Sequence, residues 1–269
     1  MNNENFQLLI YFINERERIR KAKLEGKPFP WTEDKILQKY KFCNVRRIDD
    51  AVSQWLYKEY YDSNNVTLAH CLFARVINEP QVLAIFGYPE KITKSWRMES
   101  KMLMQIMKNS GKRIVKKVYC VYSNRTPIEK FLFDYAIPKF ARLKEQPTFE
   151  GNWEQITKIK AFNSFIAGQI VGDLAWFRDF PDNKTFCPMG PGSYSGAKLL
   201  EPSLIKKQNV FNEFCLDLYD KLKDTDFAKL HPEIYESMVG IDIQNCLCEF
   251  YKYWKILNGA KFGVRRYIP

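Results

Sequence analysis

Residues 162–177, FNSFIAGQIVGDLAWF, show most clearly how this chain folds. Apolar residues recur there at helical spacing, and we predict one helix over residues 153–178. Gln169 and Asp173 are i,i+4 neighbours on this helix, and Trp176 follows about one turn later. A carboxylate among apolar side chains is costly unless it is paired or functional. Asp173 therefore caps a neighbouring helix, pairs with an arginine, or takes part in chemistry.

Helical periodicity also dominates the rest of the chain. One stretch differs, because the β-branched run Arg113–Tyr122 predicts a strand or hairpin. There is no internal repeat and no obvious flexible linker. The predicted fold class is mainly α with one small β element. Another helix is expected to start at Thr32, whose hydroxyl would cap it before the acidic residues Glu33 and Asp34. Further helices are expected near residues 4–24, 46–60, 65–77, 95–109, 127–143, 203–222 and 241–257.

Composition places the chain among ordered globular proteins. Hydrophobic residues make up 46% of the 269 positions and charged residues 27%. No apolar run approaches the roughly 20 residues that span a bilayer, and the polar start lacks the features of a signal peptide. We therefore expect a cytoplasmic protein without a membrane segment.

The cysteines and histidines argue against a metal centre. Seven scattered cysteines without a C-x-x-C pair fit reduced thiols, and the chain contains only two histidines. His70 is expected to pack within a helix. We assign no metal and no other cofactor.

The net charge of +11 favours a polyanionic partner, although lysine-rich genomes also produce basic proteins. Such charges neutralise phosphates and give salt-sensitive binding that is independent of sequence. The densest basic patch, which we expect to contact DNA phosphates, contains Lys108, Lys112, Arg113, Lys116 and Lys117.

A second stretch, Phe42–Asp50, contains a side chain suited to reading a base. The Asn44 amide offers both a donor and an acceptor, which can pair with the edge of a pyrimidine. The structural alternative makes Asn44 a helix cap and pairs Arg47 with Asp50 on the surface.

Two further stretches could carry chemistry. The Gly190-Pro191-Gly192 turn is neither a dinucleotide fingerprint nor a Walker loop, but its backbone could approach a phosphate or serve as a plain loop. In residues 244–253, Asn245, Glu249 and Lys252 form a polar stripe at i, i+4 and i+7. Glu249 and Lys252 are most simply a pair on a helix surface.

Together these stretches resemble the α-glutamyl/putrescinyl thymine pyrophosphorylase-like family, also described as the helical domain associated with phage 5-hydroxymethyluracil DNA kinases. The resemblance covers about Trp31 to Tyr253. The residues that carry it are Trp31-Thr32 with Ile36-Leu37, Phe42-x-Asn44-Val45-x-Arg47-x-x-Asp50, Phe165-x-Ala167-x-Gln169-Ile170-x-x-Asp173-Leu174, Gly190-Pro191-Gly192 and Leu247-Cys248-Glu249-Phe250-x-Lys252-Tyr253.

The resemblance implies a helical core similar to helix-hairpin-helix DNA base glycosylases. Residues 1–269 would then form a single glycosylase-like unit, either compact or divided into two lobes with the DNA and base cleft between them. Asn163 and Ser164 would lie at the DNA-binding hairpin, with Asp173 on the next helix. The Leu-Pro-Gly-x-Gly hairpin typical of that superfamily is missing, because residues 160–164 contain no glycine.

The function that we expect from this resemblance is a DNA glycosylase. It would flip and excise a bulky modified pyrimidine, such as glucosylated hydroxymethylcytosine or substituted thymine, from phage DNA in anti-phage defence. An abasic site would remain. Asp173 would stabilise the sugar cation, while Asn44, Arg47, Gln169, Trp176 and Lys252 would contact the base or its adduct.

Two alternatives remain open. In a transferase, an amine activated by Asp173 or Glu249 would displace pyrophosphate from activated hydroxymethyluracil in phage DNA, with Arg47, Gly190 and Gly192 holding the diphosphate. The third function is a non-catalytic reader of modified DNA. Modified phage DNA is the expected partner in each case, and no protein partner is implied.

Overall fold

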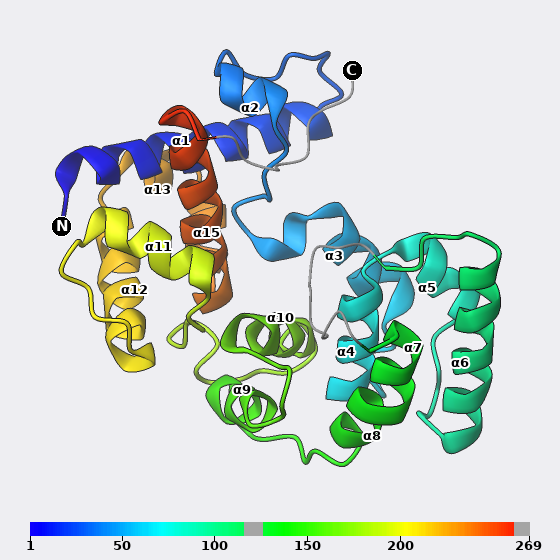
Figure 1. Cartoon of the computed structure of the whole chain (residues 1–269). Coiled ribbons are helices and arrows are strands. Elements are labelled where there is room, and N and C mark those ends of the chain that lie inside the picture. Colours follow the sequence, from blue (N-terminus) through cyan, green and yellow to red (C-terminus); the bar gives the residue numbers. More distant parts are fainter. Residues whose placement is uncertain (116–125, 261–269) are drawn as a thin grey trace. The chain divides into compact units, whose positions relative to one another are not determined.

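The computed structural model describes residues 1–115 and 126–260, and these residues are mainly helical without a β-strand (Figure 1). The mainly α fold class is thus confirmed. Most of the β element expected over residues 113–122 lies outside the described residues, and residues 113–115 form no strand. Among the described helices, none combines the length and apolar character needed to cross a membrane.

The chain divides into two compact units. Unit 1 joins both ends of the sequence, Met1–Asp50 and Lys184–Pro269, whereas unit 2 is the continuous stretch Ala51–Asn183. The helices of unit 1 are α1 (Asn3–Leu24), α2 (Lys35–Lys39), η1 (Arg47–Asp49), α11 (Pro191–Leu200), α12 (Gln208–Leu222), α13 (Asp226–Leu230), α14 (Pro232–Ser237) and α15 (Gly240–Leu257).

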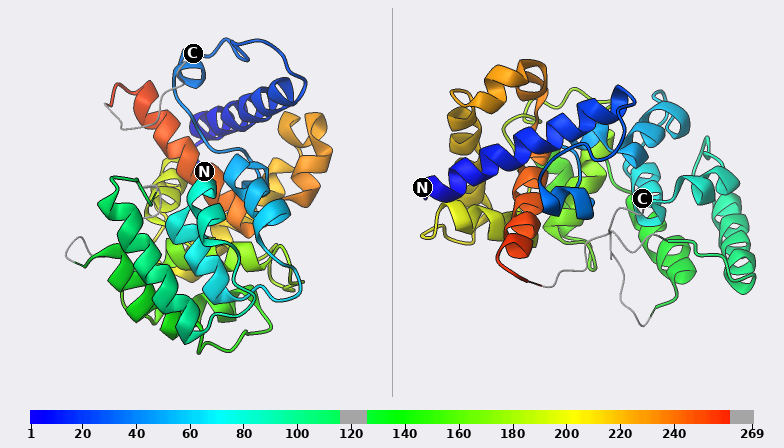
Figure 2. Two further views of the ribbon diagram at one scale, coloured as in Figure 1. Left: turned by 90° about the vertical axis from the view of Figure 1, so that its right-hand side faces the viewer. Right: turned by 90° about the horizontal axis from the view of Figure 1, so that it is seen from above.

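Helices α11 and α15 form the centre of unit 1, and α1 contacts both of them as well as α13 (Figure 2). The approach of α11 to α15 is close because α11 carries two glycines. A Cβ added at Gly196 would overlap the carbonyl oxygen of Leu247, and one added at Gly192 would lie 2.5 Å from Sγ of Cys248. Buried rings such as Phe12 and Phe250 fill the space beside this contact.

Unit 2 is built around α4, which packs against α10 and α8. The single helix predicted over residues 153–178 is wrong, because two shorter helices occupy that range. Ala161 takes a left-handed φ of 84° between them, and the Asn163 side chain caps α10 by accepting from the Ile166 N–H. The helices of unit 2 are α3 (Ala51–Trp55), η2 (Leu56–Tyr60), α4 (Leu68–Ile77), α5 (Pro80–Phe86), α6 (Lys94–Asn109), α7 (Ile128–Lys130), η3 (Phe131–Ala136), α8 (Ile137–Phe140), α9 (Phe149–Thr157) and α10 (Ser164–Leu174).

The start of α2 also differs from expectation. The capping side chain is Asp34, whose carboxylate accepts from the N–H groups of Ile36 and Leu37. Thr32, the predicted cap, accepts instead from the N–H of Asp34. Thr32 therefore positions the capping residue Asp34 but does not itself cap the helix.

Candidate functional site

Asp173 is the most deeply buried acidic residue of the resemblance motifs, with no exposed surface. Its carboxylate accepts from Nε and Nη2 of Arg75 at 2.6 and 2.7 Å and from the hydroxyl of Tyr61 at 2.7 Å. Burial, followed by the nearby Asp173 carboxylate, raises the pKa of Tyr61 well above its ordinary value, so Tyr61 is a donor here. Of the alternatives left open by the sequence, pairing with an arginine is the one observed.

The surroundings of this ion pair are partly polar and partly aromatic. Nη2 of Arg75 also donates to the Ser53 hydroxyl at 3.1 Å. The Arg75 guanidinium lies 5.4 Å from the centre of the half-buried Trp176 ring. Gln169 is buried one turn before Asp173 on α10. Unit 2 thus brings together Gln169, Asp173 and Trp176 of the predicted site residues.

The other two predicted residues on α10 lie at its beginning. Asn163 is exposed apart from its capping contact, and the Ser164 carbonyl accepts from Nε1 of Trp153 at 3.0 Å. Both residues therefore have a local structural role, and their contact with DNA stays a prediction.

In unit 1 the structure joins the Phe42–Asp50 motif to the motif on α15. Asn44 is held on several sides: its Nδ2 donates to the Asp49 carbonyl, its Oδ1 accepts from Arg16, and its carbonyl accepts from Nδ2 of Asn245. The backbone N–H of Asn44 donates to Asp50 at 2.9 Å. The side chain predicted to read a base is thus already used to hold a loop.

Glu249 connects the same loop to α15. One of its oxygens accepts from the backbone N–H of Cys43 at 3.1 Å, and the other is paired with Nζ of Lys252. Burial alone would lower the pKa of Lys252, but the Glu249 carboxylate raises it above its ordinary value. The pair predicted on the helix surface is therefore present, although Glu249 itself is buried.

Two aspartates of unit 1 hold their protons unusually tightly. Burial raises the pKa of Asp50 to about 6, and the nearby Glu249 adds to this effect. Burial also raises the pKa of Asp242 to about 6, even though Asp242 accepts from the backbone N–H of Arg47 at 2.7 Å. A carboxylate with such a pKa can exchange a proton near neutral pH, as a general base must.

Arg16, Tyr61 and Arg75 are functional-site residues that the motifs do not include. Arg75 left a signal, because it is a charged residue within the apolar run 68–77. Arg16 lies in the charged stretch that begins at Glu15, where its burial could not be read from the pattern. Arg16 donates to the carbonyls of Phe42 and Cys43, so it holds the base of the same loop as Asn44. Tyr61 gave no such signal.

The Gly190-Pro191-Gly192 turn forms the start of α11. Gly190 N–H donates to the Ser193 hydroxyl at 2.9 Å, and Gly192 faces Cys248 across the contact with α15. Close helix packing is thus sufficient to explain Gly192. A role of Gly190 and Gly192 in substrate binding stays a prediction.

The predicted basic patch lies partly in the described residues. Lys108 is paired with the Glu129 carboxylate at 2.8 Å, whereas Lys112 and Arg113 are exposed. Lys116 and Lys117 lie outside the described residues. The patch therefore offers two described cations to solvent.

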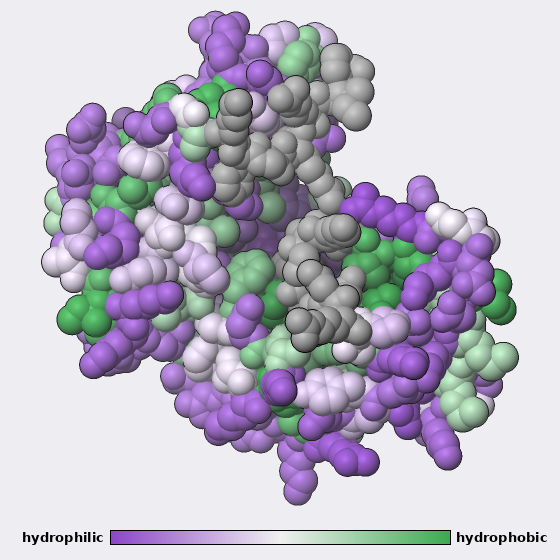
Figure 3. Space-filling model, in the orientation of Figure 1, coloured by the Kyte–Doolittle hydropathy of each residue, from purple (hydrophilic) through white to green (hydrophobic). Residues whose placement is uncertain are grey.

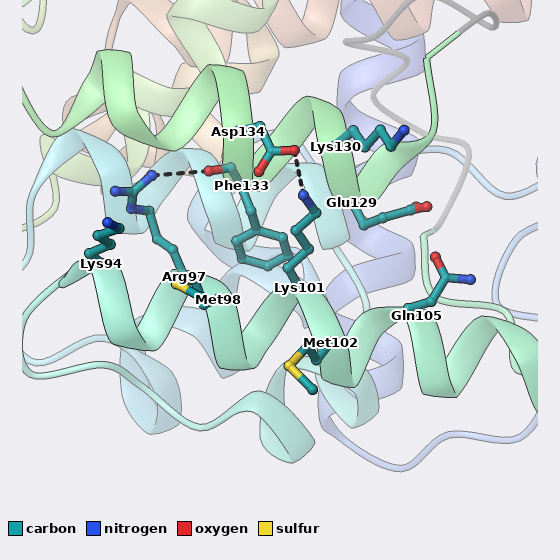
Figure 4. A pocket seen from close by; sticks show the side chains of 10 residues that line it. All are labelled: Lys94, Arg97, Met98, Lys101, Met102, Gln105, Glu129, Lys130, Phe133 and Asp134. Atoms are coloured by element: carbon teal, nitrogen blue, oxygen red, sulfur yellow. Dashed lines mark hydrogen bonds and ion pairs between the residues drawn. The ribbon is translucent and has the colours of Figure 1, made fainter.

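A groove of about 510 Å³ lies in unit 2 between α6 and the α7–η3 segment (Figure 4). Lys101 on α6 pairs with Asp134, and Arg97 donates to the Phe133 carbonyl. Figure 3 shows hydrophobic surface over α6. Two methionines of this helix, Met98 and Met102, are more than half exposed. This wall of the groove is therefore apolar as well as basic.

Glu17, His231 and Glu233 bring possible metal-ligand atoms within 4.8 Å of one another. Cationic side chains contact all three: Arg20 donates to both oxygens of Glu17, and Lys21 lies 3.0 Å from Nδ1 of His231 and 3.3 Å from Glu233. The cluster is thus a network of ion pairs and hydrogen bonds between α1 and the start of α14, and we build no metal site on it.

Comparison with known proteins identifies the class. The family model described as "5-hmdU DNA kinase, helical domain" matches residues 3–261, so the chain belongs to this family. A protein of Bacillus phage SP10 named 5-hmdU DNA kinase is 26% identical over 225 residues, covering 70% of this chain and 35% of that protein. The chain therefore spans about a third of the length of this relative. No solved structure matches.

These comparisons correct the expected function. Both names specify a kinase, so the expectation of a DNA glycosylase, a hydrolase that excises bases, is wrong. The pyrophosphate-displacing transferase does not match either, and neither name describes a non-catalytic reader. The kinase-associated part of the resemblance is confirmed, whereas the likeness to helix-hairpin-helix glycosylases is not shown.

Proposed function

We propose that this chain takes part in the phosphorylation of 5-hydroxymethyluracil in DNA and holds the DNA substrate for that reaction. The observation that carries this proposal is the match of the kinase-associated helical family to residues 3–261. The net charge of +11 supports it, because a basic protein gains affinity for DNA by releasing counterions.

We assign the DNA substrate, and not the nucleotide, to this chain because of how its glycines are placed. A Walker loop needs a Gly-Lys pair followed by Ser or Thr. Here Gly26-Lys27 is followed by Pro28, and Gly111-Lys112 is followed by Arg113. We therefore place binding of the phosphate donor on another domain or polypeptide.

Phosphoryl transfer depends mainly on positioning the acceptor in line with the donor. Rigid, hydrogen-bonded side chains suit that task better than mobile ones. The Asn44 loop, fixed by Arg16, Asn245 and Glu249, provides such a rigid element in unit 1. The pair of Arg75 and Asp173 does the same in unit 2.

Binding measurements with matched duplexes test the proposal. Fluorescence anisotropy should show tighter binding of the chain to a duplex containing 5-hydroxymethyluracil than to the same duplex with thymine, and both affinities should fall with added salt. Equal affinity for the two duplexes, or no binding, would contradict it. Label transfer from ATP to the modified duplex by the chain alone would contradict only the restriction to the substrate side.

A further inference from the structure

Three aromatic rings of unit 2 form a continuous, partly exposed cluster beside the Arg75–Asp173 pair. Tyr57 belongs to η2, and Trp176 and Phe177 come just beyond α10, after its C-cap Ala175. The Tyr57 ring stacks on Phe177 with centres 5.3 Å apart and planes 26° apart, and it meets Trp176 edge-on at 6.1 Å. Residues distant in sequence thus build one aromatic surface.

The exposure of Tyr57 distinguishes it from the tyrosines that follow in the chain. Tyr57 is 41% exposed, whereas Tyr60 and Tyr61 are 6% and 7% exposed. Trp176 and Phe177 are half-buried. Tyr57 is thus the most exposed ring of the three, as a side chain that stacks on a base must be.

The backbone that presents Tyr57 is itself unusual. Residues Leu56–Tyr60 form a π-helical turn, a rare conformation that is found frequently at functional sites. This observation is independent of the ring contacts.

The rings rest on a rigid base. The Arg75 guanidinium lies 5.4 Å from the Trp176 ring centre, and Arg75 is itself fixed by Asp173 and Ser53. A platform ordered in advance loses little conformational entropy when a flat ligand binds.

We propose that Tyr57, Trp176 and Phe177 form a stacking platform for one unpaired nucleobase of the DNA. This inference rests on the proposed function, which makes DNA the partner. Every base has an aromatic face, and stacking on protein rings tolerates sequence variation. The base could come from a single strand or be flipped from a duplex, since enzymes that modify bases commonly extrude them. Arg75 and Asp173 act as positioning residues for the platform.

The test uses oligonucleotides carrying 2-aminopurine, whose fluorescence falls when it stacks on an aromatic ring, in single-stranded and duplex form. Tyr57→Ala should weaken binding about 5- to 100-fold and abolish the fluorescence change, as expected for loss of one stacked base. The salt dependence should not change, because no charge is removed. Tyr57→Phe keeps the ring and should bind within about twofold of the original chain.

Two controls keep the result interpretable. Tyr57→Leu preserves apolar cover over Phe177 without a ring, so it tests stacking even if Tyr57→Ala unfolds. Phe29→Ala removes a ring that is 49% exposed in unit 1 and should leave binding unchanged. If Tyr57→Ala weakens binding to single strands alone, the ligand is a single-stranded base. If it weakens binding to both single strands and duplexes, the ligand is a base flipped from the duplex.

Unchanged DNA binding by folded Tyr57→Ala and Tyr57→Leu chains would overturn the platform and leave the proposed function standing. An original chain that binds no DNA would instead overturn the proposed function.

Discussion

The guanidinium of Arg75 and the carboxylate of Asp173 meet in a two-point ion pair, with both side chains almost completely removed from solvent. Burying two charges is costly, and the attraction between them compensates only when the geometry is good and the remaining hydrogen bonds are made. Tyr61 and Ser53 make such bonds on either side of the pair. Replacing one member of the pair should therefore lower the free energy of unfolding far more than replacing both members by apolar residues.

Asp173→Asn should lower the free energy of unfolding by about 3–5 kcal/mol, because it leaves the Arg75 charge buried without its counter-ion. Urea denaturation followed by circular dichroism measures this loss. The double variant Arg75→Met, Asp173→Leu should lose less than the sum of the two single variants. Strictly additive losses would show that the two side chains are not coupled.

Stability should depend on pH through Asp242. An unfolded aspartate has a pKa near 4, whereas burial raises that of Asp242 to about 6, so the folded chain binds the proton more tightly between these values. The free energy of unfolding should therefore fall as the pH rises from about 4 to about 6 and then level off. Asp50 contributes in the same direction.

Urea denaturation at several pH values checks this dependence. In the Asp242→Asn chain, the fall in the free energy of unfolding should be smaller by at most about 3 kcal/mol. This limit follows from a pKa raised by about 2, at about 1.4 kcal/mol per pKa unit. The exposed Asp226 on α13 provides the matched control, and Asp226→Asn should leave the curve unchanged. If the free energy of unfolding falls by the same amount in the Asp242→Asn chain as in the original chain, other groups cause the pH dependence.

Reversing the two exposed cations of the basic patch, Lys112→Glu with Arg113→Glu, should weaken binding to all DNA sequences alike. If both contact phosphates, the slope of log affinity against log salt should decrease by about 2. The control reverses Lys223 and Lys229, two exposed lysines of unit 1, for the same change in net charge. Equal losses in both double variants would indicate a general charge effect and not a specific patch.

Gly196→Ala should destabilise the chain by about 1–3 kcal/mol or more, because the new Cβ would overlap the carbonyl of Leu247 and force α11 away from α15. Thermal denaturation measures the effect. Ser195→Ala, one position earlier on the same helix, should change stability by less than about 0.5 kcal/mol. A normal melting temperature for Gly196→Ala would mean that the two helices can separate without cost.

The helices were predictable where apolar spacing was strong. The ranges expected near residues 4–24, 95–109 and 241–257 agree with α1, α6 and α15 within a few residues. The break between α9 and α10 was not predictable from spacing alone, because the left-handed Ala161 carries no glycine signal and the apolar pattern continues on both sides.

The residues of the candidate site were visible in the sequence, but most of their partners were not. The motif around Asp173 allows an arginine as its partner, yet nothing local identifies Arg75, which lies 98 positions away. Similarly, the contact of Glu249 with the backbone of Cys43 spans 206 positions. Such pairs arise from tertiary packing, which single-sequence patterns do not encode.

Unit 1 is built from both ends of the sequence, and this determines which unit can fold first during synthesis. All of the unit 2 sequence leaves the ribosome before residues 184–260, which supply α11 and α15 to unit 1. Unit 2 can therefore fold while α1 still lacks its packing partners, and its folding shortens the effective loop that unit 1 must close. A nascent chain that has emerged only as far as Asn183 would expose the apolar residues of α1, and such exposed surface makes a folding intermediate prone to aggregation.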